Sequence, residues 1–250
     1  AATSRAYVLD TTAPTTSVAS VAFSADSGVS GSDFITRTAA QTVSGTLSAN
    51  LAAGESVLVS LDNGATWNTA NATVGTNAWS LAGRTLSASS TLLVKVTDTA
   101  GNDGAVLSQA YVYDTAATVA TVNSLQTDSS TPTLTGNATL AAGETMTVTV
   151  GGATYNVVPV AGHWSLDLST AVPASGALAL PTAHRYEVVA TVTDLAGNTS
   201  TDVSSNELTV GTIAIVAPSS PLPPPLPVQT QIPPSLDIQT GGENTPQVSR

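Results

Sequence analysis

The stretch Val96-Thr97-Asp98-Thr99-Ala100-Gly101-Asn102 returns later in the chain as Val192-Thr193-Asp194-Leu195-Ala196-Gly197-Asn198. In each copy an alternating apolar run ends in Thr-Asp, and a small-residue turn with Gly and Asn follows. This pattern is typical of a β-strand that ends in a tight turn. The copies begin 96 residues apart, which is about the length of one β-sandwich domain. The sequence therefore predicts two tandem β-sandwiches.

The charge of the chain restricts its partners. Only 9% of the residues are charged, and the 6 Lys and Arg residues leave a net charge of −11. Nucleic-acid binding needs clustered cations, so this class of partner is excluded. The same scarcity argues against an anionic membrane surface. The carboxylates favour metal cations instead, and calcium is the hard cation expected outside cells.

The remaining composition indicates an exported all-β protein. Apolar residues make up 42% of the chain and aromatic residues only 4%, so each core is expected to consist mainly of Val, Leu, Ala and Ile. The chain has no cysteine, so packing, metals or repeat stacking must supply its stability. No apolar run of 18 residues predicts a membrane span. No signal peptide is recognisable, and we expect any export signal to lie outside this segment.

Short strands separated by turn residues predict the fold class in detail. Repeat one is expected over 11–114 and repeat two over 115–211, and no helical periodicity of useful length is found. The expected strands of repeat one are Thr16–Phe23, Gln41–Ser48, Val57–Leu61, Ala65–Thr69, Asn77–Leu81, Thr91–Thr97 and Val106–Tyr113. Asn63-Gly64 predicts a tight hairpin turn, and Gly151-Gly152 takes its place in repeat two.

Two further segments flank the repeats. Ala6-Tyr7-Val8-Leu9-Asp10 matches Ala110-Tyr111-Val112-Tyr113-Asp114 at four of five positions. Residues 1–10 are therefore predicted to be the end of a preceding repeat and its linker.

After Val210 the pattern changes, and nine of the 14 prolines lie in 217–250. Residues 212–250 are predicted to be an extended Pro-rich linker, with polyproline II conformation. Alternatively this tail is a docking peptide or an arm anchored by Ile232, Leu236 and Ile238.

Several motifs together carry a family resemblance. They are D-T-T-A-P-T at 10–15, D-S-G…S-D-F-I-T at 26–36, G-E-S-V-x-V-S-L-D-N-G-A-T-W at 54–67 and the repeated V-T-D-x-A-G-N. Over residues 6–210 the chain resembles the bacterial immunoglobulin-like repeats of large secreted adhesins and biofilm surface proteins. The resemblance implies Greek-key sandwiches, bacterial export, tandem stacking and calcium near domain junctions. Repeat two departs from this pattern, because it lacks the D-T-T-A-P opening and its first loop keeps only Asp128.

Alternate turns of a sandwich lie at alternate ends, which predicts where the carboxylates meet. Calcium takes six to eight oxygen ligands, and loops of this kind supply them. The candidate calcium ligands are Asp10, Asp98 and Asn102 at the start of repeat one, and Asp114, Asp194 and Asn198 at the junction, with Asp26 and Asp33 approaching the junction from the far end of repeat one. Alternatively these residues only cap turns through their own side chains.

The sequence gives little support for an enzymatic function. The only histidines are His163 and His184, which we expect at the surface or at strand edges. No G-x-S-x-G, dinucleotide or P-loop pattern is present, and ordinary strand and loop placement explains Glu187 and Asp167. Trp79 and Trp164 occupy equivalent positions, as do Trp67 and Tyr155. Packing in the core or between sheets explains such placement better than sugar stacking.

The sequence thus predicts two Ig-like Greek-key β-sandwiches with an extended Pro-rich tail. Their expected function is non-catalytic, as stacked spacers of a secreted or cell-surface bacterial fibre, rigidified by calcium at the junctions. The expected partners are neighbouring repeats or identical subunits, and a surface glycan or protein receptor is a further candidate. The alternatives are a self-assembling subunit of a sheath, surface layer or appendage, and a carbohydrate-binding module of a secreted enzyme.

Overall fold

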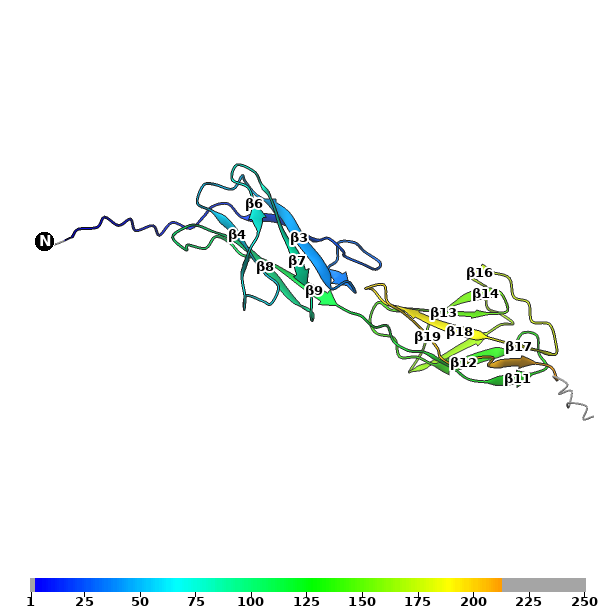
Figure 1. Ribbon diagram of the computed structural model, residues 1–250. Coiled ribbons are helices and arrows are strands. Elements are labelled where there is room, and N and C mark those ends of the chain that lie inside the picture. Colours follow the sequence, from blue (N-terminus) through cyan, green and yellow to red (C-terminus); the bar gives the residue numbers. More distant parts are fainter. Residues whose placement is uncertain (1–2, 213–250) are drawn as a thin grey trace, which may run out of the picture. The chain divides into compact units, whose positions relative to one another are not determined.

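The computed structural model describes residues 3–212, and all regular structure in this range is β-strand. The strands, most of which are labelled in Figure 1, form five sheets, and their buried side chains form two separate hydrophobic cores. One core belongs to repeat one and the other to repeat two. No helix within 3–212 is long and apolar enough to cross a membrane. The predicted all-β class is confirmed, and the Pro-rich tail, with the predicted anchors Ile232, Leu236 and Ile238, lies outside the described residues.

Repeat one consists of two sheets around one core. The first has the strand order β1-β3-β7-β6 and the second β2-β9-β8-β4-β5. Consecutive strands β3 and β4 therefore lie in different sheets, as do β7 and β8. The bounds are β1 Val18–Phe23, β2 Ile35–Thr36, β3 Ala40–Leu47, β4 Ser56–Ser60, β5 Asn68–Thr69, β6 Asn71–Ala72, β7 Ala78–Thr85, β8 Ser90–Thr97 and β9 Leu107–Tyr113.

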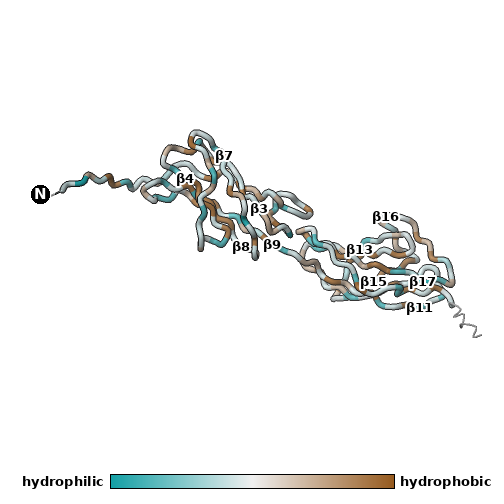
Figure 2. Tube along the Cα trace, viewed as in Figure 1, coloured by the Kyte–Doolittle hydropathy of each residue, from teal (hydrophilic) through white to brown (hydrophobic). Residues whose placement is uncertain are grey.

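Alternation along the strands builds the core of repeat one. In β8 the side chains of Leu92, Val94 and Val96 are fully buried, while their neighbours are partly exposed. They pack against residues of the opposite sheet such as Val43 and Trp79. Successive side chains of a strand point to opposite faces, so this period of two fixes which face of β8 points inward. The hydrophobic segments follow the strands of both repeats in Figure 2.

Repeat two reuses this plan with one sheet divided. Its sheets have the orders β10-β12-β15, β11-β20-β17 and β16-β14-β13-β18-β19. The bounds are β10 Thr121–Val122, β11 Leu125–Thr127, β12 Thr133–Asn137, β13 Thr145–Val150, β14 Ala153–Val157, β15 His163–Asp167, β16 Ser175–Gly176, β17 His184–Tyr186, β18 Val188–Thr193, β19 Thr199–Thr201 and β20 Leu208–Val210. The strands β17 and β18 take the place of β8. Strand β17 pairs with β20, and strand β18 pairs with β13 and β19. The sheet orders of both repeats are consistent with two Ig-like sandwiches.

The predicted hairpin turns differ between the repeats. Gly151 and Gly152 connect β13 directly to β14, where Val150 pairs with Ala153. Asn63 and Gly64 have the expected positive φ angles of 56° and 91°, but the pairing of β4 and β5 resumes only at Val59 and Asn68. Asp62 holds this wider loop by accepting hydrogen bonds from the backbone N–H and the hydroxyl of Thr66. The Asn-Gly signal therefore predicted the turn correctly but not the length of the connection.

Candidate functional site

The turn Asp98–Asn102 holds the incoming linker of repeat one. Asp98 Oδ1 accepts hydrogen bonds from the backbone N–H groups of Ala100 and Asn102, both at 2.9 Å. Asp98 Oδ2 accepts one from Asn102 Nδ2 at 2.8 Å. The same Nδ2 donates to the backbone carbonyl of Asp10 at 3.2 Å. The Asp thus orients the Asn, and the Asn fixes the linker 92 residues earlier in the chain.

The turn Asp194–Asn198 repeats this arrangement in repeat two. Asp194 accepts from the backbone N–H of Asn198 at 2.8 Å and from its Nδ2 at 2.7 Å. Asn198 Nδ2 also donates to the carbonyl of Asp114 at 3.0 Å. We call each such set of Asp, Asn and linker carbonyl a linker clamp. The structure therefore brings together Asp10, Asp98 and Asn102, and separately Asp114, Asp194 and Asn198.

Repeat two has an additional tie to its linker. Glu144 Oε1 accepts a hydrogen bond from the backbone N–H of Thr118 at 2.8 Å, and Oε2 accepts one from Ala141. In repeat one Glu55 caps its own loop in the same way, through the N–H of Ala52. The position equivalent to Thr118 is Pro14, which has no N–H to donate. The D-T-T-A-P opening therefore removes the bond that repeat two forms.

The carboxylates of the first loop of repeat one stabilise that loop. Asp26 Oδ2 accepts a hydrogen bond from the N–H of Phe34 at 2.9 Å, and Asp33 Oδ1 accepts one from the N–H of Ile35 at 3.0 Å. Phe34 has a φ of 61°, a left-handed conformation that bulky residues rarely adopt. Asp26 and Asp33 therefore hold a strained bend in the loop between β1 and β2.

The same loop, together with Arg37 directly after β2, contacts backbone carbonyls in the turn of repeat two. Ser27 Oγ donates to the carbonyl of Ala196 at 2.9 Å, and the N–H of Val29 donates to that of Leu195 at 3.1 Å. Arg37 Nη1 donates to the carbonyl of Gly197. We call these three hydrogen bonds the loop–turn junction. The loop does approach the linker clamp of repeat two, as the sequence predicts, but through Ser, Arg and backbone groups.

Gly28 makes this close contact possible. Its φ is 105°, and a Cβ atom at this position would lie 1.9 Å from the carbonyl oxygen of Leu195. No real Cβ approaches an oxygen so closely, and any larger residue would push the loop away from the turn. Glycine permits both the backbone conformation and the approach.

The Asp and Asn side chains of both linker clamps are engaged in hydrogen bonds with the protein itself. Both oxygens of Asp98 and both of Asp194 accept N–H hydrogen bonds, and each Asn directs its NH₂ group at the linker carbonyl. The Nδ2 atom of each Asn lies within hydrogen-bonding distance of two oxygen acceptors, the Asp carboxylate and the linker carbonyl. This arrangement requires a donor at that position and so assigns it as the NH₂ end of the amide. Within residues 3–212 no three His, Cys, Asp or Glu side chains form a group that could hold a metal. Calcium binding by the eight candidate residues stays a prediction.

Hydrogen bonding stabilises the charged form of these carboxylates. The amide of Asn102 holds the pKa of Asp98 below its ordinary value, although partial desolvation opposes this effect. At Glu144 burial raises the pKa, but the hydrogen bonds from Thr118 and Ala141 together outweigh burial and lower it. Both groups are therefore ionised at neutral pH, as their roles as hydrogen-bond acceptors require.

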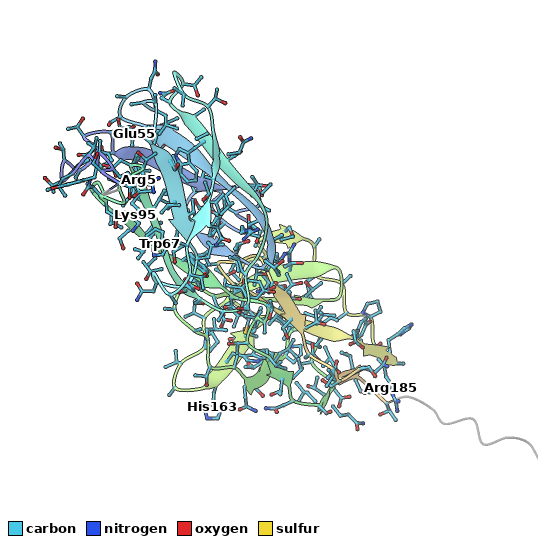
Figure 3. The ribbon with its side chains drawn as sticks, turned by 60° about the vertical axis from the view of Figure 1, so that its left-hand side comes forward. Arg5, Glu55, Trp67, Lys95, His163 and Arg185 are labelled. Atoms are coloured by element: carbon cyan, nitrogen blue, oxygen red, sulfur yellow. The ribbon has the colours of Figure 1, made fainter. Side chains whose placement is uncertain are left out.

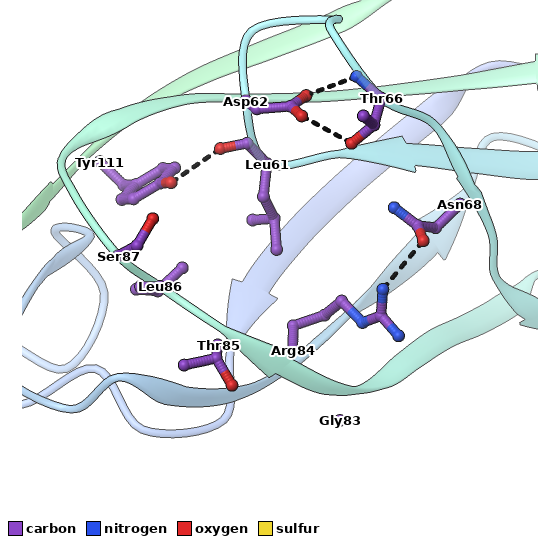
Figure 4. Close-up of a pocket in the computed structure, with 10 residues that line it drawn as sticks. All are labelled: Leu61, Asp62, Thr66, Asn68, Gly83, Arg84, Thr85, Leu86, Ser87 and Tyr111. Atoms are coloured by element: carbon purple, nitrogen blue, oxygen red, sulfur yellow. Dashed lines mark hydrogen bonds between the residues drawn. The ribbon is translucent and has the colours of Figure 1, made fainter.

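A cleft of about 350 Å³ lies in repeat one beside the loop of Asp62 (Figure 4). Several of its polar side chains bind one another or the backbone: Arg84 donates to Asn68, and the hydroxyl of Tyr111 donates to the carbonyl of Leu61. The hydroxyl and backbone N–H of Thr66 lower the pKa of Asp62 to about 2. These groups stabilise the loop between β4 and β5.

The aromatic and histidine predictions hold at most positions. Trp79, Trp164 and Tyr155 are buried in the two cores. Trp67 differs, because it is half-buried under Lys95, whose Nζ lies 4.3 Å from the ring centroid and 2.6 Å from Asp103 Oδ2 (Figure 3). His163 and His184 are exposed at strand β15 and strand β17. Their Nδ1 atoms lie within hydrogen-bonding distance of Asn137 Oδ1 and the Thr182 carbonyl.

Residues 12–115 match the sequence family described as "Bacterial Ig-like domain". The predicted resemblance to bacterial Ig-like repeats is confirmed over this segment. The matched segment includes Asp98 and Asn102 of the linker clamp and the loop of Asp26, and it begins two residues after Asp10. No curated relative matches the sequence.

Several solved structures of tandem β-domains are similar to this chain. One is the BSP domain of a biofilm-associated protein, with 17% identity over 79% of this chain and 30% of the other, at a TM-score of 0.26. Another is a tetra-tandem repeat from the extending region of a large adhesion protein, with 21% identity over 73% and 46%, at a TM-score of 0.28. A third contains the fibronectin(III)-like modules of Clostridium thermocellum CbhA, with 12% identity over 78% and 95%, at a TM-score of 0.34. The chain thus spans less than half of the first two structures, and at these TM-scores we base no inference on them.

Proposed function

We propose that this chain is a non-catalytic spacer segment of a bacterial surface or extracellular fibre protein, in which consecutive repeats are joined by direct hydrogen bonds. The loop–turn junction carries this proposal. Three donors of repeat one meet three consecutive carbonyls of repeat two, at Leu195, Ala196 and Gly197. The resemblance to bacterial Ig-like repeats supports the location at the cell surface or in a secreted fibre.

The linker clamp of repeat two adds a second connection at the junction, beside the loop–turn junction. Strand β9 ends at Tyr113, and the next residue, Asp114, is held by Asn198. Strand β2 pairs with β9 in parallel, so the loop before β2 is anchored to the same strand. The linker and the loop therefore reach the turn of repeat two together, and each restrains the other. Such nearest-neighbour contacts are how repeat proteins gain length without a common core.

The three hydrogen bonds of the proposed junction form directly between groups of the two repeats and do not themselves require calcium. The predicted rigidification by calcium is tested by measuring the distribution of distances between the two repeats in chelator and in millimolar calcium. A surface glycan or protein receptor remains a candidate partner of the parent protein. Trp79 and Trp164 are buried, and Trp67 lies under Lys95, so these tryptophans give the carbohydrate-binding alternative little support.

The proposal is tested by measuring how tightly the two repeats hold one another. The chain has no cysteine, so spin labels can be placed at Cys residues substituted for Thr73 and Asn156, both exposed. In chelator we expect a narrow distribution of distances between the labels. Gly28→Val should broaden it, because the added side chain separates loop and turn.

Gly75→Ala is the matched control. Gly75 also has a positive φ, 83°, but a Cβ atom there meets nothing within 4 Å. The distance distribution of this variant should stay narrow. A broad distribution in the unchanged chain would contradict the spacer proposal, and concentration-dependent filaments in light scattering would favour the self-assembling subunit instead.

A further inference from the structure

The two linker clamps differ in what covers them. In repeat two Ala196 is only 1% exposed, and Leu195 and Gly197 are half-buried under the loop of repeat one. In repeat one the equivalent residues Thr99, Ala100 and Gly101 are exposed. Among the residues that the structure describes, no hydrogen bond reaches the carbonyls of these three residues. The turn of repeat two is thus covered by the loop of repeat one, whereas the equivalent turn of repeat one is uncovered among the described residues. We call the turn of repeat one the open turn.

The two turns present their carbonyls in the same way. The N–H of Asp98 bonds the carbonyl of Asn102 at 3.1 Å, as the N–H of Asp194 bonds that of Asn198 at 3.1 Å. The φ angles of Gly101 and Gly197 are 89° and 86°. A loop that fits the turn of repeat two therefore also fits the turn of repeat one.

The segment Ala6–Leu9 leads into the open turn and exposes three consecutive apolar side chains. Tyr7, Val8 and Leu9 are 88%, 93% and 80% exposed. The equivalent of Tyr7 is Tyr111 of β9, which is only 5% exposed in the core of repeat one. Contiguous exposed apolar side chains indicate a surface that a partner covers. The linker clamp at Asp10 places this segment at the turn as the clamp at Asp114 places β9.

We propose that the Asp98–Asn102 turn and Ala6–Leu9 form a docking surface for a further sandwich of the repeat-one type, joined to this chain through Ala6–Asp10. Ala6–Leu9 is the last strand of that sandwich, and its Tyr7 fills the position that Tyr111 fills in repeat one. Its loop, equivalent to Ser27–Arg37, donates hydrogen bonds to the carbonyls of Thr99, Ala100 and Gly101. This inference rests on the proposed function and adds the surface and the partner.

The partner must resemble repeat one and not repeat two. In repeat one the residues between β1 and β2 form the loop that reaches the next turn. In repeat two only Asn123 and Ser124 separate β10 from β11. A sandwich of the repeat-two type therefore lacks the loop that makes these contacts in repeat one.

The test is a chain with one repeat added. Residues 1–114 are joined directly to residues 11–250, so that a second copy of repeat one precedes the open turn with the native linker length. Segmental isotope labelling distinguishes the two copies of Val29. We expect the Val29 amide of the added copy to be as protected from hydrogen exchange as the original Val29 amide. Gly28→Val in the added copy alone should speed its exchange at least about tenfold.

Two further measurements support this comparison. The amide of Val94, in the core strand of the added copy, should stay protected in Gly28→Val, which shows that the copy is folded. Arg37→Gln in the added copy provides a second, milder variant with the same direction of effect. Fast exchange of the added Val29 beside a protected original Val29 would overturn this inference alone. Fast exchange at both positions would overturn the proposed function as well.

Discussion

The turns Asp98–Asn102 and Asp194–Asn198 have the same motif and the same internal hydrogen bonds, yet only the second is covered by another repeat. Asp194 and Asn198 are buried, whereas Asp98 and Asn102 are partly exposed. The motif therefore has two separable roles. The Asp and Asn side chains hold the linker of their own repeat, and the backbone carbonyls of the turn bind the loop of the repeat before. The following predictions test these roles from the largest expected effect to the smallest.

Removing the clamp amide should cost more in repeat two than in repeat one. Asn198→Ala leaves the buried Asp194 carboxylate and the Asp114 carbonyl without their donor, which we expect to cost about 2–3 kcal/mol of stability. Asn102→Ala removes the same bonds at a partly exposed site and should cost about 1 kcal/mol. Hydrogen exchange of the core amides Val192 and Val96 reports the stability of each repeat separately.

The control is Asn156→Ala, on the exposed side of β14, where we expect little change. Equal losses of stability in Asn198→Ala and Asn102→Ala would show that burial under the loop of repeat one does not strengthen the linker clamp.

The glycines of the two turns form a matched pair for the loop–turn junction. At Gly101 an added Cβ meets nothing within 4 Å, whereas at Gly197 it lies 3.0 Å from the Cα of Gly28. Alanine at either position should cost about 1 kcal/mol, because of the positive φ. Only Gly197→Ala should also increase the exchange rate of the Val29 amide. An equal exchange rate of this amide in both variants would contradict the contact between Gly28 and the turn.

The Glu144 tie should be sensitive to the backbone at position 118. Thr118→Pro removes the N–H, as Pro14 does in repeat one, so the pKa of Glu144 should rise. Thr118→Ala keeps the N–H and should raise this pKa less. Because the pKa of Glu144 is lowered in the folded state, its stabilising contribution is present above about pH 4.5 and is lost as the pH falls through the folded pKa. NMR titration gives the pKa of the Glu144 carboxyl in the unchanged chain, in Thr118→Ala and in Thr118→Pro. Equal pKa values in all three proteins would contradict the hydrogen bond from the N–H of Thr118 to Glu144.

Acid should loosen the linker of repeat one through Asp98. The lowered pKa of Asp98 means that its contribution is complete above the ordinary Asp pKa and is lost as the pH falls through the folded value. In Asn102→Ala the pKa of Asp98 should move back up toward the ordinary Asp value, because the amide no longer favours the carboxylate. An unchanged titration of Asp98 in this variant would show that Asn102 does not hold it.

The sequence was sufficient for the elements that depend on local patterns. Alternation in 91–97 and 188–193 predicted strands, and the repeated phrase predicted both the number of sandwiches and the pairing of Asp98 and Asp194 with the linkers at Asp10 and Asp114. The width of the loop after Asp62 was missed, because its hydrogen bonds depend on the side chain of Thr66 and not on the Asn-Gly turn. Trp67 was expected inside, but it lies under Lys95 at the surface.

The loop–turn junction could not be read from the sequence in detail. Asp26 and Asp33 attract attention as calcium ligands, yet the contacts between repeats come from Ser27, the Val29 backbone and Arg37. Backbone donors and acceptors leave no residue signature. A usable signal was Gly28, within D-S-G, because a glycine beside a polar loop often marks a close backbone approach. A second was Pro14, whose missing N–H distinguishes the linkers of the two repeats.

The hydrogen-exchange rate of the Val29 amide tests the central claim most directly. This amide donates to the carbonyl of Leu195, so its protection reports the contact between the repeats and no other part of the fold. In chelator we predict exchange at least about tenfold slower than in Gly28→Val, with the core amides of both repeats unchanged. Equal exchange in the two proteins, or protection that arises only after calcium is added, would contradict a junction made by direct hydrogen bonds.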